Sequence, residues 1–430
     1  MLTVIVVLAL IVMALFGVPL FSIIAAGALY GFYIADIDLQ VIGIELYRIA
    51  ETPLLMALPM FTFAGYILSA SNTSQRMLNL IQALVGWLPG GLVIFAFIAS
   101  AIFTAFTGAS GVTIVALGAL LYPALKNAGY TEKFSLGMVT ASGSLGLLLA
   151  PSLPLILYGI IAQQMELEIR FEINDLFIAG LMPAALMVIF LSIYSIYKNQ
   201  QFKIKTEDFN KEILLQAIWA MRWELPMPFF LVFGIYSGFF AISEAAALVA
   251  LYFMFVETLI YKEITFVELR KVILESMVMV GSILLILAVS LALTNVFVDA
   301  EVPDHLFEFV KNNVDSKIEF LIVLNIFLLF VGAILDIFSA LVIIVPLILP
   351  VAISFGVHPV HLGIIFLANM QIGYLTPPVG INLFISSFRF KKPISEVYSA
   401  SLPFVFVLLA VLLLITYVPQ LSLFFFRMKI

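Results

Sequence analysis

Long apolar runs separated by short polar stretches dominate the chain. Three of these runs cover residues 176–197, 277–297 and 401–426, and each contains about twenty residues. A hydrocarbon core about 30 Å thick needs about 20 apolar residues for each helical crossing. The runs lack the alternation of polar and apolar residues that is typical of a membrane β-barrel. The pattern therefore predicts an all-α polytopic membrane protein.

The longest polar interruption, residues 197–226, lies close to the middle of the chain and invites a search for two repeats. We expect a first repeat at 1–197, a linker at 198–225 and a second repeat at 226–430. A shift of 227 positions aligns glycines and prolines of the two parts in the same order: Pro123 with Pro350, Gly129 with Gly356, Gly146 with Gly373 and Pro151 with Pro378.

Each repeat contains two interrupted apolar stretches. Residues 90–125 and 318–355 have polar centres. Backbone groups without hydrogen-bond partners cannot face lipid, so these polar centres predict re-entrant hairpins, which enter the membrane and turn back. Residues 134–162 and 360–388 carry glycine and proline at their centres. Proline removes a backbone donor and clashes with the preceding turn, so these two stretches predict broken helices.

The first apolar stretch of each repeat leaves two alternatives. Residues 2–34 and 226–261 each form either one kinked crossing or two short ones. A separate amphipathic segment is expected at 263–275, before the run at 277–297. If each repeat begins with two short crossings, the two repeats have opposite orientations in the membrane. Most of the 20 basic residues then lie on the same side of the membrane as the linker. The positive-inside rule then places the linker in the cytoplasm and both termini outside, with about ten transmembrane helices and two hairpins.

Composition supports the membrane assignment and excludes several function classes. The 430 residues are 64% hydrophobic and 11% charged, and cysteine is absent, so disulfides and thiolate chemistry are excluded. The net charge of −6, without a basic cluster, gives no reason to expect nucleic acid. The first 17 residues have no basic region or cleavage pattern, which favours a retained membrane segment. We expect no cofactor.

The broken helices are candidate ion sites. Inverted repeats with a broken helix in each half are typical of secondary transporters, in which unwound backbone oxygens coordinate cations near the membrane midplane. The alternative is a proline kink satisfied by neighbouring helices and water. The candidate sodium-binding or substrate-binding residues are Ser142, Ser144, Gly146 and Ser152 in the first break, and Asn369, Gly373, Thr376, Pro377, Gly380 and Asn382 in the second.

The hairpin tips supply the remaining candidates. The segment 107–113 is rich in small and hydroxyl residues, and a half-helix beginning near Ser110 points its positive dipole end at the site. The alternative is a crossing between helices that pack through small residues. Asp336 is expected to be the only acid clearly within the membrane apart from the loop-adjacent Glu244, which marks it as a functional candidate or a helix N-cap. The candidates at the tips are Thr107, Gly108, Ser110, Thr113, Gly332 and Asp336.

An enzyme and a channel are weaker alternatives. Residues 108–111 match G-x-S-G, which surrounds a nucleophilic serine in intramembrane proteases, but that chemistry needs a histidine base. His305, His358 and His361 lie at expected loop or span ends in the second repeat and show no metal-ligand spacing. A channel does not need two broken helices facing two hairpins.

Several motifs together resemble one transporter family over nearly the whole chain. The chain resembles the large membrane subunit of a tripartite ATP-independent periplasmic (TRAP) transporter, of the DctM or SiaM type. The motifs are "ALPMFTFAGYIL", "GWLPGGL", "FTGASGVTIVALGALLYPAL", "GSLGLLLAPSLPLILYG", "GIYSGFFAISEAAA", "GAILDIFSALVIIVPLILP" and "IGYLTPPVGINLF".

The resemblance implies a sodium-driven importer of the bacterial inner membrane that works by an elevator-like movement. It implies two partners besides membrane lipid: a small four-span subunit of the Q type and a periplasmic binding protein of the P type. The cargo would be an organic acid with a carboxylate, such as sialic acid or a dicarboxylate. The family's usual serine pair appears here as Ala109 and Ser110, and its usual double proline as Ala150 and Pro151. A stand-alone sodium/organic anion carrier is the alternative.

Overall fold

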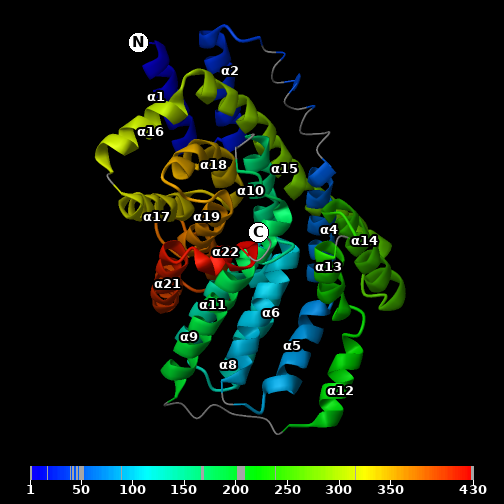
Figure 1. The fold of residues 1–430 in the computed structure, drawn as a ribbon. Coiled ribbons are helices and arrows are strands. Elements are labelled where there is room, and N and C mark those ends of the chain that lie inside the picture. The colour runs from blue at the N-terminus through cyan, green and yellow to red at the C-terminus, as the bar shows by residue number, and fades with distance from the viewer. Residues whose placement is uncertain are drawn as a thin grey trace.

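The computed structural model shows a helical protein in the part of the chain that it describes (Figure 1). The structure describes residues 2–427 except 17, 39, 41, 42, 45, 46, 48–52, 89, 166–168, 201–208, 238 and 315. In chain order the helices are α1 (Leu2–Leu15), α2 (Leu20–Ala35), η1 (Pro53–Met56), α4 (Ala57–Ala70), α5 (Thr73–Val85), α6 (Gly91–Thr107), α7 (Ser110–Thr113), η2 (Ile114–Gly118), α8 (Ala119–Asn127), α9 (Glu132–Ser142), η3 (Leu145–Leu148), α10 (Leu153–Gln164), α11 (Ile173–Asn199), α12 (Lys211–Ala220), α13 (Pro226–Tyr236), α14 (Ile242–Phe255), η4 (Val256–Ile260), α15 (Phe266–Asp299), α16 (Val302–Asn313), α17 (Lys317–Ile334), α18 (Ile337–Ser354), α19 (Pro359–Gly373), α20 (Ile381–Phe390), α21 (Ile394–Tyr417) and α22 (Gln420–Arg427).

The apolar runs of the sequence become long helices. Within the described residues, seven helical segments are long and apolar enough to cross a membrane, and shorter apolar helices such as α4, α6 and α19 accompany them. This confirms an all-helical protein with several candidate crossings. The expected total of ten crossings stays a prediction.

The first stretch of each repeat forms two short helices rather than one kinked helix. In the first repeat, the hydroxyl of Tyr30 near the end of α2 donates to Thr3 Oγ1 at the start of α1, at 3.2 Å. In the second, Tyr252 on α14 donates to the carbonyl oxygen of Trp223, just before α13, at 2.8 Å. Such contacts require each pair to be antiparallel, as the two-helix alternative expects.

Two expected boundaries are wrong. The amphipathic segment 263–275 and the apolar run 277–297 form one helix, α15, because neither proline nor glycine separates them and the helical hydrogen bonds continue through Ser276. The final crossing was expected at 401–426, but the helix found there, α21, begins earlier, at Ile394, and ends earlier, at Tyr417. Pro419 lies between α21 and α22. The linker also contains a helix, α12, whose start is capped by Asn210.

Helix–turn–helix segments occur where the hairpins and broken helices were expected, and re-entry of the hairpins into the membrane stays a prediction. The first hairpin turns at Gly108, which has a φ of +66°, and the second turns at Leu335 and Asp336. The helices after the two turns, α7 and α18, begin 227 residues apart. Gly129 and Gly356, with the same separation, both have positive φ. The spacing suggested by the sequence therefore recurs in the backbone.

The broken helices occupy the centre of the molecule. Every residue of α19 is buried, as is nearly all of α10. Around them, α9 packs on α21, α10 on α18, and α19 on α17, while α2 and α15 pack together further out (Figure 1). The two breaks thus lie within a shell of helices from both repeats, and this arrangement positions the candidate site.

Candidate functional site

A threonine hydroxyl joins the first hairpin to the first break. Thr104 Oγ1 lies 2.8 Å from Thr113 Oγ1, and it lies 2.9 Å from the carbonyl oxygen of Gly143, to which it donates. All three residues are buried. Thr104 connects α6, α7 and the start of the break, although the sequence analysis did not select it. Its position between Ser100 and Thr107, on the same face of a mostly apolar helix, was the available signal.

Both breaks approach a hairpin through a glycine. A Cβ atom on Gly146 would lie 2.0 Å from the carbonyl oxygen of Ala101 and 2.4 Å from the amide nitrogen of Ala105. A Cβ atom on Gly373 would lie 2.5 Å from the carbonyl carbon of Gly332. A side chain cannot fit at either position without movement of the backbone, so glycine permits the contact in both repeats.

The serines of the first break bind backbone oxygens. Ser142 Oγ donates to Val139 O at 3.1 Å, and Ser152 Oγ donates to Leu147 O at 2.8 Å. Ser144 Oγ donates to the carbonyl oxygen of Gln371 at 3.4 Å. This last contact brings the two breaks together in the centre of the molecule. In this conformation, the three hydroxyls therefore satisfy carbonyl oxygens of the chain.

Asp336 caps the second half-helix. Its Oδ1 accepts from the amides of Phe338 and Ser339 at 3.0 and 3.1 Å, and its Oδ2 accepts from the hydroxyl of Ser339. The hydroxyl of Tyr374, in the second break, accepts from the amide of Ile337 at 2.6 Å. The N-cap interpretation of Asp336 is confirmed. The role of Tyr374 was missed because nothing in the local sequence pairs it with a residue 37 positions away.

The second break folds over the second tip. The amides of Val379 and Gly380 both donate to the carbonyl oxygen of Ala333 at 3.1 Å. The amide and hydroxyl of Thr376 both donate to Gly373 O at 2.9 Å. A carbonyl oxygen has two lone pairs, so these two hydrogen bonds fill the acceptor capacity of Gly373 O. Pro377, next to these bonds, is exposed.

The two asparagines of the second broken helix differ. Asn369 donates to Asn325 Oδ1 on α17 at 2.7 Å, so its amide nitrogen faces that helix rather than the break. Asn382 is fully buried, and both polar atoms of its side chain lack a hydrogen-bond partner within the described residues. A buried amide without partners is costly, so Asn382 remains a candidate for contact with a ligand, as does Asn369 through its Oδ1, which also lacks a partner within the described residues.

The helix that carries Asn382 runs alongside the first hairpin. A Cβ on Gly111 would lie 2.7 Å from Ile385 Cδ1, and Arg389 Nε donates to Val115 O at 3.2 Å. In both contacts, the residue on α20 comes the same number of positions after its partner in the first hairpin. The two helices therefore run in the same direction, with α20 parallel to the start of α7 and η2. Asn382 lies one turn before Ile385, towards the end of α20 that is nearer the first tip. Ala109 occupies the N-cap position of α7 and makes no side-chain cap.

A cluster of charges that the sequence analysis missed lies apart from the breaks. Arg76 Nε lies 2.5 Å from Glu224 Oε1, its Nη2 lies 3.1 Å from Glu257 Oε1, and its Nη1 bonds to Glu263. Glu257 is fully buried in the last turn of the α14 segment. Glu224 and Glu257 lie near the ends of their helices, so the expectation that Asp336 is the only clearly intramembrane acid besides Glu244 stays a prediction. These charges looked isolated in the sequence because their pairing joins residues almost 200 positions apart.

The fold is helical, with several helices long and apolar enough to cross a membrane. The structure is similar to that of the YdaH transporter from Alcanivorax borkumensis, with a TM-score of 0.64 over 88% of this chain and 87% of that chain. The two sequences are 12% identical, so this similarity concerns the fold alone.

Sequence comparison defines the family. The family described as "Tripartite ATP-independent periplasmic transporter, DctM component" matches residues 6–421, and the chain belongs to this family of transporter permeases, which is not an enzyme family. The isethionate TRAP transporter permease protein DctMQ of Oleidesulfovibrio alaskensis is 33% identical over 94% of this chain, which spans 62% of that relative's length. The C4-dicarboxylate TRAP transporter large permease protein DctM of Rhodobacter capsulatus is 33% identical over 91% of each chain.

Proposed function

We propose that this chain is the large membrane subunit of a sodium-coupled importer in a bacterial inner membrane. A periplasmic binding protein of the P type delivers a small organic acid, and a small four-span subunit of the Q type completes the membrane complex. The observation that supports this most directly is that each repeat places a broken helix against a hairpin, through Gly146 and Gly373. Family membership supports the two partners.

The coupling cation binds at the second tip in this proposal. Asp336 supplies negative charge there, and its three hydrogen bonds leave about one lone-pair site, on Oδ2, for a cation. Carbonyl and hydroxyl oxygens are ligands that a hard cation such as sodium uses at unwound helices. Because Gly373 O already accepts two hydrogens, the oxygens of residues 374–380 are the better candidates.

The substrate carboxylate binds at the first tip. The two tips occupy corresponding positions, but the second has Asp336 as its N-cap whereas the first has Ala109. A carboxylate brought by the substrate can occupy the place that Asp336 fills in the second repeat, because helix N-termini favour anionic oxygens. The amide of Asn382 is buried, has no partner among the residues that the structure describes, and can donate to the same carboxylate.

The repeats are inverted, and the two hairpins and broken helices move together as an elevator against the remaining helices. The recurring separation of 227 residues supports two repeats. With two short helices crossing the membrane at 2–35 and at 226–255, each repeat has an odd number of crossings, which is what inversion of the second repeat requires. The linker is then cytoplasmic. The named relatives carry isethionate or C4-dicarboxylates, so we propose an organic acid with an anionic head group, with sialic acid as the second substrate to test.

Uptake by reconstituted complexes tests this function. Proteoliposomes are prepared with this chain alone, with the small subunit, and with both partners, and are given labelled C4-dicarboxylate or sialic acid with and without a sodium gradient. We expect uptake only with all three proteins and an inward sodium gradient. Full uptake by the chain alone indicates a stand-alone carrier, and uptake that is insensitive to sodium contradicts the coupling.

A further inference from the structure

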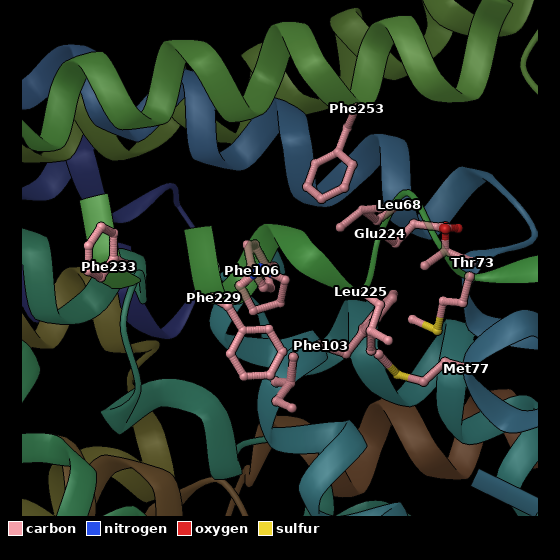
Figure 2. Close-up of a pocket in the computed structure, with 13 residues that line it drawn as sticks. Leu68, Thr73, Met77, Phe103, Phe106, Glu224, Leu225, Phe229, Phe233 and Phe253 are labelled. Carbon is pink, nitrogen blue, oxygen red and sulfur yellow. The ribbon is translucent and has the colours of Figure 1, made fainter. Parts of the chain in front are cut away.

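A second cavity is lined by residues outside both breaks. A cavity of about 720 Å³ separates the first hairpin from the beginning of the second repeat (Figure 2). Aromatic side chains form much of its wall: Phe103 and Phe106 from α6, Phe229 and Phe233 from α13, and Phe253 from α14. None of the candidate sodium-binding or substrate-binding residues lines it. The cavity therefore needs a function of its own.

One end of the cavity is polar. Figure 2 shows Glu224 and Thr73 together at the end opposite Phe233. Glu224 belongs to the Arg76 cluster, in which three carboxylates surround one guanidinium. This end of the cavity therefore has more negative than positive charge. An occupant with an apolar body and a cationic head complements both parts.

The carboxylate of Glu224 can accept one more hydrogen bond. Its present donors are Arg76 Nε at 2.5 Å, the hydroxyl of Tyr261 at 3.0 Å and the hydroxyl of Thr73 at 3.5 Å. Burial, together with the nearby Glu224, raises the pKa of Tyr261 above its ordinary value, so its hydroxyl stays protonated and remains a donor. A carboxylate has about four lone-pair sites, which leaves one for a ligand donor.

The polar end lies where membrane-spanning helices end. Glu224 is two residues before α13, and Glu257 is near the end of the candidate span Ile242–Ile260. The aromatic walls extend along the same helices towards their apolar centres. A molecule that fills the cavity therefore has its head at the membrane surface and its tail in the hydrocarbon region, which is the orientation of a phospholipid.

The volume of the cavity fits a single acyl chain better than a protein helix. A helix is about 10 Å wide, so 720 Å³ holds less than two turns, far short of the roughly 20 residues that cross a bilayer. The same volume is typical of pockets that enclose a small amphipathic molecule. We propose that this cavity binds one phospholipid, with an acyl chain between α6 and α13 and a primary ammonium head on Glu224. The lipid contacts the first hairpin and the second repeat together.

Lipid binding to the purified complex tests the proposal. The chain with its small subunit is delipidated in detergent and titrated with phosphatidylethanolamine or phosphatidylglycerol, and bound lipid is counted by native mass spectrometry. We expect one phosphatidylethanolamine at the site, bound about tenfold more tightly than phosphatidylglycerol, because the hydroxyl head group of the latter lacks the positive charge that strengthens a hydrogen bond to the carboxylate. Equal affinity of the two lipids contradicts the ammonium contact and overturns the proposal.

Two variants and a matched control locate the lipid. Glu224→Gln should bind the two lipids equally, while Ile102→Trp should weaken both because it fills the apolar part without touching the charges. Ile322→Trp places the same side chain on the exposed face of α17 and should behave as wild type. Thermal unfolding checks that each variant is folded. If Ile102→Trp keeps its lipid but loses the small subunit, a partner helix occupies the cavity and the lipid proposal is wrong.

Discussion

Replacing Asp336 separates its two roles, because asparagine and alanine remove different parts of the side chain. Asp336→Asn keeps an oxygen that can accept from the amides of Phe338 and Ser339, now 3.0 and 3.1 Å away, and asparagine is as good an N-cap as aspartate. Asp336→Ala removes the cap as well, at a cost of about 0.5–2 kcal/mol. Asp336→Asn should therefore fold and insert almost normally, whereas Asp336→Ala should lower the unfolding temperature.

The charge has a larger effect on cation binding. A sodium ion about 4 Å from the carboxylate gains up to about 4 kcal/mol at an effective dielectric constant near 20. Even if solvent and other oxygens recover most of this, a loss of about 1.4 kcal/mol raises the sodium concentration for half-maximal uptake tenfold. We therefore expect at least about a tenfold increase for Asp336→Asn. Thr376→Val should act in the same direction but more weakly, since its hydroxyl is one oxygen among several.

The assay is the initial rate of uptake against sodium concentration in proteoliposomes that contain all three proteins. Protein level and unfolding temperature are measured for every variant. The reasoning is refuted if Asp336→Asn, at normal protein level and unfolding temperature, has the sodium curve of the wild type. It is also refuted if the sodium curve changes only in Asp336→Ala, because the cap rather than the charge would then be responsible.

Three further outcomes are expected. Gly373→Ala should destabilise the protein by about 1–3 kcal/mol and slow uptake, because the new methyl group meets backbone atoms. Gly281→Ala should have neither effect, because the space around Gly281 is open. Thermal unfolding and uptake are measured for both variants. Arg76→Gln should cost about 3–5 kcal/mol because it leaves buried carboxylates without their guanidinium, as a lower unfolding temperature would show; an unchanged temperature contradicts this. Reporters fused in the linker 200–212 and after Lys429 should lie on opposite sides of the membrane, and the same side for both rules out inversion.

Local chemistry explains why the breaks and tips were predictable from sequence. Glycine and proline act on their own backbone, so Gly108 and the segment 373–380 disrupt an apolar helix whatever surrounds them. The capping role of Asp336 was predictable for the same reason, because an N-cap binds amides two and three residues further on. Hydropathy then located the long helices, since each must match the bilayer.

Long-range pairing was not predictable. The contact between Ser144 and Gln371 depends on how two distant helices cross, and no local pattern encodes it. The same holds for Arg76 and Glu224, which look like ordinary loop charges until the fold brings them together. The continuous helix α15 was missed for a different reason. A change from amphipathic to uniformly apolar sequence indicates a change of surroundings, but it does not end a helix.

The parallel contact between α20 and the first hairpin has a consequence for synthesis. Arg389 binds the carbonyl oxygen of Val115, and 274 residues separate them. At the usual rate of about 5–20 residues per second, the first hairpin waits about 15–55 s in the membrane before α20 has been made. During that time, the surface that α20 later covers is open to lipid, to the insertion machinery or to another chain. The first repeat is therefore exposed to misassembly until the ribosome has almost finished the second.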